Sequence, residues 1–134
     1  MGDGLLIRCK DCEHENEFMF GMGFLFSSFE SVLELLPHRK YHIAKDILKN
    51  NKNTKSKYDG YEVYQCEKCS SVQNTFLIKI TDEKNHVLMS SITKCSRCKN
   101  SRKKIKRKNN KLKNYKCPKC KSKNLYYAES MMWD

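Results

Sequence analysis

The sequence lacks any apolar stretch close to the length of about 20 residues that a membrane-spanning helix needs. The start of the sequence, residues 1–5, also lacks the basic segment and the cleavage site of a secretory signal peptide. We therefore expect a cytoplasmic protein that does not enter the membrane. In that reducing compartment, closely spaced cysteines are expected to bind metal rather than to form disulfides.

The sequence also lacks the short motifs that mark common active sites. It has no P-loop, no glycine-rich nucleotide fingerprint, no Ser/His/Asp arrangement and no carboxylate pair with a plausible cleft. Four histidines are present, but no cysteine is left over to share a metal with them, so we expect surface or capping roles for His14, His38, His42 and His86. We expect no enzymatic activity and no catalytic residue.

The sequence does contain eight cysteines, all of them in C-x-x-C pairs. Both thiolates of such a pair can bind one ion, and two pairs complete a tetrahedral site with no open position for water. This pattern predicts two structural Zn²⁺ ions as cofactors. Iron in the same ligands, with a role in electron transfer, is the less favoured alternative. The eight expected ligands are Cys9, Cys12, Cys66, Cys69, Cys95, Cys98, Cys117 and Cys120.

These pairs resemble the knuckles of the zinc-ribbon, or rubredoxin-like, class, and the whole chain resembles small double-zinc-ribbon proteins of bacteria. The segment Cys117-Pro118-Lys119-Cys120 has the C-P-x-C form that is common there. The resemblance implies two ribbons, each holding one ion at the ends of hairpins, and it implies no activity. Glycine often follows the second cysteine in that class, whereas this chain has Glu13, Ser70, Lys99 and Lys121 at those positions.

Four pairs can share two ions in more than one way. We expect sequential pairing, with the first and second pairs at one ion and the third and fourth at the other. The alternative is that a hairpin between Cys69 and Cys95 unites the two middle pairs and leaves the first and last pairs to meet. Sequential pairing predicts an N-terminal ribbon at 1–93, with a helical insertion at about 28–49 and a β-hairpin, followed by a basic C-terminal ribbon at 94–134.

The apolar pattern within these ranges predicts an α+β fold. Ser27 and Glu30 fit a capping box for a helix at about 28–36, and a second amphipathic helix is expected at about 39–49, followed by a solvated loop at 50–57. The run Phe18–Phe26 predicts a buried strand, with a protein-docking face as the alternative. Further strands are expected at 5–8, 61–65, 72–80, 87–93 and 125–128.

Charge is distributed unevenly along the chain. Residues 1–90 hold 12 Lys/Arg and 13 Asp/Glu, whereas residues 91–134 hold 15 and 2, and the segment 99–123 holds 13 Lys/Arg and no acid. The simplest interpretation of such a run is a solvated hairpin tip. The sharper interpretation is a surface that contacts phosphates, with nearby tyrosines as stacking platforms for bases.

On this basis we expect binding to DNA or RNA without base-specific readout, because no recognition helix can be picked out. The runner-up function is a protein-interaction adaptor, or small subunit of a larger assembly, whose basic face meets an acidic protein partner. The expected nucleic-acid contacts are Arg102, Lys103, Lys104, Lys106, Arg107, Lys108, Lys111, Lys113 and Tyr115.

Overall fold

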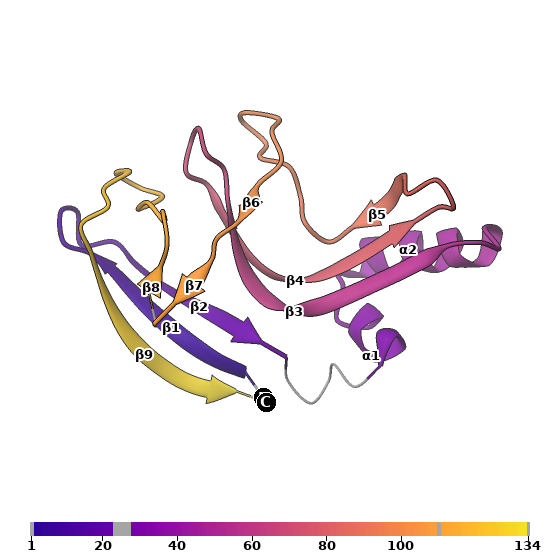
Figure 1. Cartoon of the computed structure of the whole chain (residues 1–134), viewed down its shortest axis with the longest axis horizontal. Coiled ribbons are helices and arrows are strands. Elements are labelled where there is room, and N and C mark those ends of the chain that lie inside the picture. The colour runs from indigo at the N-terminus through magenta and orange to yellow at the C-terminus, as the bar shows by residue number, and fades with distance from the viewer. Residues whose placement is uncertain (1, 23–27, 110, 134) are drawn as a thin grey trace.

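The computed structural model describes residues 2–22, 28–109 and 111–133, with side chains described only as far as residue 128. The chain forms a strongly curved antiparallel sheet, with both helices lying near one end of it (Figure 1). The main sheet has the strand order β5-β4-β3-β2-β1-β9, with β6 paired to β3, and β7 and β8 form a separate small hairpin. The elements are β1 Gly2–Cys9, β2 Glu15–Gly21, α1 Phe29–Leu33, α2 His38–Asn50, β3 Lys55–Gln65, β4 Val72–Thr81, β5 Val87–Ser90, β6 Lys103–Lys104, β7 Arg107–Lys108, β8 Lys111–Leu112 and β9 Leu125–Trp133.

The expected fold class, an α+β fold of two four-cysteine zinc ribbons with a helical insertion in the first, is wrong. The molecule is a small β-rich domain in which only two short helices occur among the described residues. Both helices lie where the apolar pattern predicts them. However, they join β2 to β3, whereas the expected insertion lay between two knuckles that share an ion. The error follows from the assumed pairing of the cysteines, which the structure also overturns.

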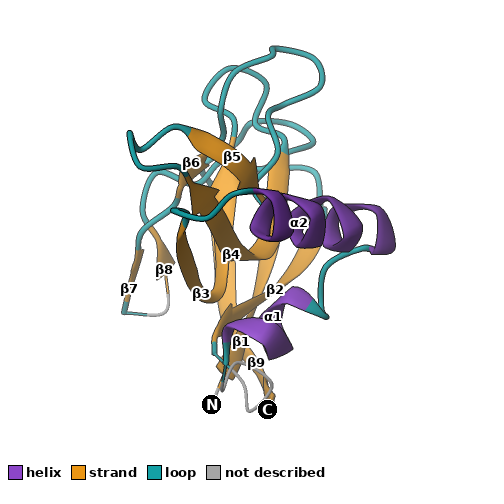
Figure 2. Cartoon of the chain, turned by 90° about the vertical axis from the view of Figure 1, so that its right-hand side faces the viewer, coloured by secondary structure: helices purple, strands orange, loops and turns teal. Residues whose placement is uncertain are grey.

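The two helices cover one face of the β3–β4 hairpin (Figure 2). Helix α1 is capped by Ser28, whose Oγ accepts a hydrogen bond from the N–H of Ser31 at 3.2 Å, and the expected cap Ser27 lies outside the described residues. The helices and the hairpin together bury a first core, which consists of Val32, Leu33, Leu36, Ala44, Phe76, Ile78, Ile80 and Met89. Alternate residues of β4 point into this core, so the others face the opposite side of the sheet.

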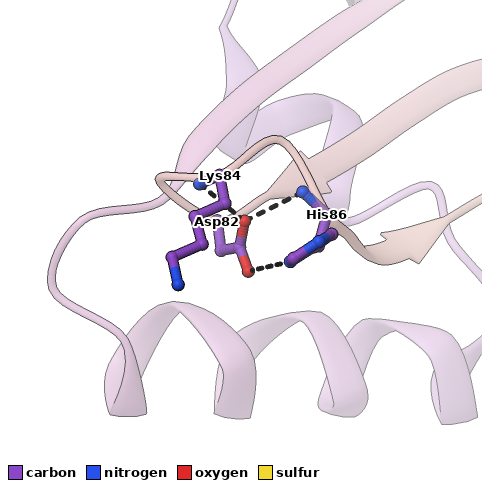
Figure 3. A network of polar contacts seen from close by, with 3 residues as sticks. All are labelled: Asp82, Lys84 and His86. Atoms are coloured by element: carbon purple, nitrogen blue, oxygen red, sulfur yellow. Dashed lines mark hydrogen bonds and ion pairs between the residues drawn. The ribbon is translucent and has the colours of Figure 1, made fainter.

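The β3–β4–β5 meander confirms the hairpin expected between 72–80 and 87–93, but its second strand, β5, already ends at Ser90. Strand β3 starts earlier than expected, because Lys55–Asp59 pair with β4, and the predicted loop at 50–57 is therefore wrong from residue 55 onward. The β4–β5 turn is closed by Asp82, whose carboxylate accepts hydrogen bonds from the N–H groups of Lys84 at 2.9 Å and His86 at 2.8 Å (Figure 3). The N–H bonds also hold the pKa of Asp82 below its ordinary value.

A second core lies on the sheet formed by β2, β1 and β9. It contains Leu5, Ile7, Phe18, Phe20, Val63, Leu112 and Tyr115. Part of the predicted run Phe18–Phe26 is thus core: Phe18 and Phe20 are buried in β2, whereas residues 23–27 lie outside the described residues.

The two cores meet at a narrow junction. Strands β2 and β3 are paired through Gly21 and Tyr61. Next to that pair, the backbone of Gly60 lies so close to the carbonyl of Gly21 that a Cβ at position 60 would overlap it and the side chain of Met22. A glycine is therefore required for the strands to approach each other here.

Strands from the last third of the chain pair with strands from the first two thirds: β6 with β3 and β9 with β1. The expected division into domains at residue 93 stays a prediction. Within the described ranges, no helix is long and apolar enough to cross a membrane.

Candidate metal centres and a basic groove

The four C-x-x-C pairs adopt one common backbone conformation. In each, the N–H of the first cysteine donates to the carbonyl five residues later at 2.9 Å. In addition, the N–H of the residue after the second cysteine donates to the carbonyl of the first, at 2.8–3.0 Å. That residue has φ between 59° and 65° at Glu13, Ser70, Lys99 and Lys121. These are the positions where the ribbon class often has glycine, so the chain keeps the left-handed turn without the residue that adopts it most easily.

The knuckles meet in two groups of four thiols. The outer centre contains Cys9, Cys12, Cys117 and Cys120, and the inner centre contains Cys66, Cys69, Cys95 and Cys98. The expected sequential pairing is therefore wrong, and the alternative, in which the middle pairs unite and the terminal pairs meet, is confirmed.

Strand pairing explains which knuckles meet. The first knuckle follows β1, the last precedes β9, and these two strands are antiparallel neighbours with Cys9 opposite Leu125. A further backbone bond, from the N–H of Lys10 to the carbonyl of Asn124 at 2.9 Å, holds the two knuckles together. At the inner centre, the second knuckle forms the β3–β4 turn, and the chain leaving β5 returns to it with the third knuckle.

The geometry of both groups fits a tetrahedral metal ion. Within each group the four sulfur atoms all lie within 4.8 Å of one another. The Sγ atoms of Cys9 and Cys120 are 3.4 Å apart, and those of Cys69 and Cys95 are 3.1 Å apart. A tetrahedral ion with Zn–S bonds of about 2.3 Å requires sulfur atoms about 3.8 Å apart. A small adjustment of the sulfur positions would therefore accommodate such an ion in each group.

The pKa values of the thiols at the inner centre show why positive charge is needed there. The Ser71 hydroxyl donates to the Sγ of Cys95 at 3.3 Å, and this bond, together with the N–H of Cys98 and the thiol of Cys69, lowers the pKa of Cys95 to about 5. Burial and the neighbouring thiols raise the pKa of Cys98 to about 12. Since one thiolate opposes the formation of the next, a cation is needed to hold all four sulfurs ionised together.

The basic segment connects the two centres. It leaves the inner centre at Cys98, passes through β6, β7 and β8, and enters the outer centre at Cys117. A groove with a volume of about 500 Å³ lies along it, bounded on the other side by Gln65, Cys66 and Glu67. Six lysines line this basic groove: Lys103, Lys104, Lys106, Lys113, Lys116 and Lys123.

Four of the expected nucleic-acid contacts line the groove, namely Lys103, Lys104, Lys106 and Lys113. Arg102 instead lines a neighbouring cavity. The remaining expected contacts lie elsewhere, on or beside the β7–β8 hairpin, and none of them lines the groove.

Arg107 and Tyr115 are occupied within the fold. The Arg107 guanidinium donates to both carboxylate oxygens of Asp3 and lies over the ring of Phe20, 4.7 Å from its centroid. The side chain of Tyr115 is 2% exposed, and its ring packs edge-on against Phe18. Since Tyr115 cannot present its ring to a base, the expectation that it serves as a stacking platform is wrong. Lys108 and Lys111 are exposed on the hairpin.

Sequence reasoning missed Lys116 and Lys123 as groove residues, although both belong to the basic run. It also missed Gln65, which is 4% exposed. The Gln65 amide donates to the carbonyls of Lys116 at 2.7 Å and Ser70 at 3.0 Å, and its Oε1 accepts from the N–H of Lys116 at 3.2 Å. This side chain fixes one wall of the groove to the second knuckle. A single glutamine carries no sequence signal for such a role.

The two groups of four cysteines fit a fold that binds two metal ions, as the resemblance to double zinc ribbons implies. No family model, curated protein or solved structure is significantly similar to this chain.

Proposed function

We propose that this protein is a non-enzymatic zinc protein that binds the phosphate backbone of nucleic acid in its basic groove. The observation that carries the proposal is the convergence of six lysines on one concave surface between the two metal centres. Lysine ammonium groups release condensed counterions when they contact phosphates, and this release drives binding that does not depend on sequence.

Acidic side chains of the protein neutralise only part of the positive charge of the groove lysines. Among the described residues, Glu67 is the one acidic residue that lines the groove, and its carboxylate lies 2.9 Å from the Nζ of Lys103. Lys104 is 3.9 Å from Glu62. The remaining groove lysines form no ion pair among those found in the described residues, which leaves Lys106, Lys113, Lys116 and Lys123 for an anionic partner.

A structural role for the metal supports the non-enzymatic part of the proposal. Four thiolates fill a tetrahedral coordination sphere, whereas catalytic zinc keeps one position open for water or substrate. Zinc suits this donor set because thiolates are soft ligands and each group is closed. When bound, the ions would tie both ends of the basic segment to the sheet. Elemental analysis of the purified protein tests the metal: two zinc ions per chain are expected, whereas a coloured, iron-loaded protein with reversible reduction would indicate an electron carrier.

The test of the groove is salt-dependent binding to labelled DNA and RNA. The groove variant changes Lys106, Lys113, Lys116 and Lys123 to Ser. The matched control changes Lys45, Lys49, Lys52 and Lys57 to Ser, which removes the same charge from exposed positions in or near helix α2. With six phosphate contacts, the slope of log K against log salt is expected to be about −5 on duplex and about −4 on single strands.

We expect the groove variant to lose at least about tenfold in affinity and to show a shallower slope, because four of the six contacts are gone. The control should lose much less. If both variants weaken binding equally, attraction is a property of net charge and the groove is not the site. If the unmodified protein binds no nucleic acid near 100 mM salt, an acidic protein partner becomes the better proposal.

A further inference from the structure

A second cavity lies beside the basic groove, with β6 between them. It has a volume of about 400 Å³, within the range of about 300–1,000 Å³ typical of ligand sites. Its floor is the face of the β3–β4 hairpin turned away from the helices, where Leu77 and Lys79 alternate with the core residues Phe76 and Ile78. Its far wall is the chain that runs from β5 into the third knuckle.

The two sites share one residue. Lys104 lines both the groove and the second cavity. It pairs with Tyr64 in the register of β6 on β3, and Tyr64 lines only the second cavity. A nucleic-acid strand bound by its phosphates along the groove would therefore reach the second cavity by crossing β6 at Lys104.

The chemistry of the second cavity differs from that of the groove. Leu77, Val87 and Ile92 give it apolar walls, and Val87 is 53% exposed. No acidic residue lines the cavity in the part of the chain that the structure describes. An apolar surface with cations at its rim suits a flat, largely apolar group attached to an anionic chain.

Arg102 contributes a guanidinium to the wall of this cavity. Nη1 of Arg102 donates to the carbonyl and the hydroxyl of Thr93, at 3.0 and 2.8 Å, so the chain beside the cavity holds the side chain in place. Nε of Arg102 is covered by the protein, so a ligand in the cavity would meet the guanidinium through its Nη atoms. Nucleobases carry hydrogen-bond acceptors at their edges.

We infer that the second cavity receives an unpaired nucleobase, and that the protein therefore prefers single-stranded nucleic acid. This inference rests on the proposed function, since the phosphates bound in the groove deliver the base. The base packs against Leu77 and Ile92 and accepts a hydrogen bond from the guanidinium of Arg102. A base within a duplex is stacked and paired on both sides and cannot enter.

The experiment compares three labelled probes with equal strand length: a single strand, the same strand with abasic residues throughout its centre, and a duplex. The metal-loaded protein is titrated with each at one low salt concentration. We expect the single strand to bind roughly tenfold tighter than the abasic strand, because only the intact strand can bury a base in the cavity. The duplex should also bind more weakly than the single strand.

Two cavity variants sharpen the comparison. Ile92→Ser removes part of the apolar wall, and Arg102→Lys keeps the charge but removes the guanidinium. Both should reduce the preference for the intact strand over the abasic strand without weakening abasic binding. Ile43→Ser, an exposed change on α2, is the matched control. Metal content identifies any variant that fails to fold.

The outcomes separate the two proposals. Equal affinity for the intact and abasic strands, or for single strand and duplex, overturns the base site and leaves the phosphate groove standing. Failure of all three probes to bind overturns both. An unchanged preference in folded Ile92→Ser and Arg102→Lys proteins would place the base elsewhere and also overturns the inference.

Discussion

Arg107 holds Asp3 through two parallel hydrogen bonds, of 2.9 Å to Oδ1 and 2.6 Å to Oδ2, although the residues are 104 positions apart in the chain. The pair fastens the basic segment to β1, and the ring of Phe20 lies beneath the guanidinium. Bidentate pairs of this kind are more specific in geometry than a lysine contact. The most basic part of the chain thus uses one of its cations to fix its own position.

A double-mutant cycle of Asp3→Asn and Arg107→Gln measures that contact. We expect a coupling free energy of unfolding of about 1 kcal/mol, since the pair is only partly buried. Arg8 and Glu15, 3.8 Å apart and more exposed, provide the control pair, for which about 0.3 kcal/mol is expected. Equal coupling in the two pairs would show that Arg107 is an ordinary surface cation.

The same pair sets a pH expectation. The hydrogen bond from Arg107 holds the pKa of Asp3 below its ordinary value of 3.8. A carboxylate with a lowered folded pKa stabilises the fold fully above its unfolded pKa and loses that contribution as the pH falls through the folded pKa. The coupling measured by chemical denaturation should therefore be the same at pH 6 and pH 8. A decrease at pH 6 would contradict the assignment.

The cysteine pairing can be tested by counting metal ions in double variants. Cys9→Ser with Cys117→Ser removes two ligands from one centre, so the protein should retain one ion per chain. Cys9→Ser with Cys66→Ser damages both centres and should retain none tightly. Sequential pairing would reverse the two results. Cobalt substitution, with its thiolate charge-transfer absorption, gives the same count by spectroscopy.

Ser71 provides a test of how a neighbouring hydroxyl supports the inner centre. Because this hydroxyl stabilises the Cys95 thiolate, Ser71→Ala should raise the pKa of Cys95 and weaken metal binding at the inner centre by about 10–100-fold. The outer centre should be unaffected. Ser96→Ala, an exposed change within the knuckle that contains Cys95, serves as the control in competition titrations with a chelator. If both variants lose metal affinity equally, the effect belongs to the surroundings of Cys95 in general and not to the Ser71 hydroxyl.

The left-handed residue after each knuckle predicts a stabilising substitution. Lys121 has φ 64°, so Lys121→Gly should raise the free energy of unfolding by about 1 kcal/mol relative to Lys121→Ala. Lys119 lies in the same knuckle and is not among the residues with positive φ, so glycine there should destabilise. Denaturation of the metal-loaded proteins measures both. If Lys121→Gly is less stable than Lys121→Ala, the side chain at this position contributes more to stability than the left-handed backbone conformation does.

Much of the site was predictable because the signals are local. The spacing of the cysteines predicts ligation, and the apolar pattern predicts both helices. The partners of each knuckle are decided by the pairing of β1 with β9, which joins residues more than 100 positions apart. Local spacing carries no information about that choice. The same limit explains Tyr115: beside a lysine run it resembles a stacking platform, but Phe18 and Asn16 lie over it only after the chain has folded.

The nested arrangement of the two centres also sets an order of assembly. At the inner centre, Cys69 and Cys95 are 26 positions apart in the chain, whereas at the outer centre Cys12 and Cys117 are 105 positions apart. Closing the fourfold longer loop in an unfolded chain costs about 1.2 kcal/mol more. During synthesis, the first knuckle leaves the ribosome with only half of its ligand set, and the inner knuckles can capture an ion long before the fourth knuckle emerges. The thiols of Cys9 and Cys12 are thus made before those of the inner centre but filled after them, and until then they compete for free metal as an unprotected dithiol.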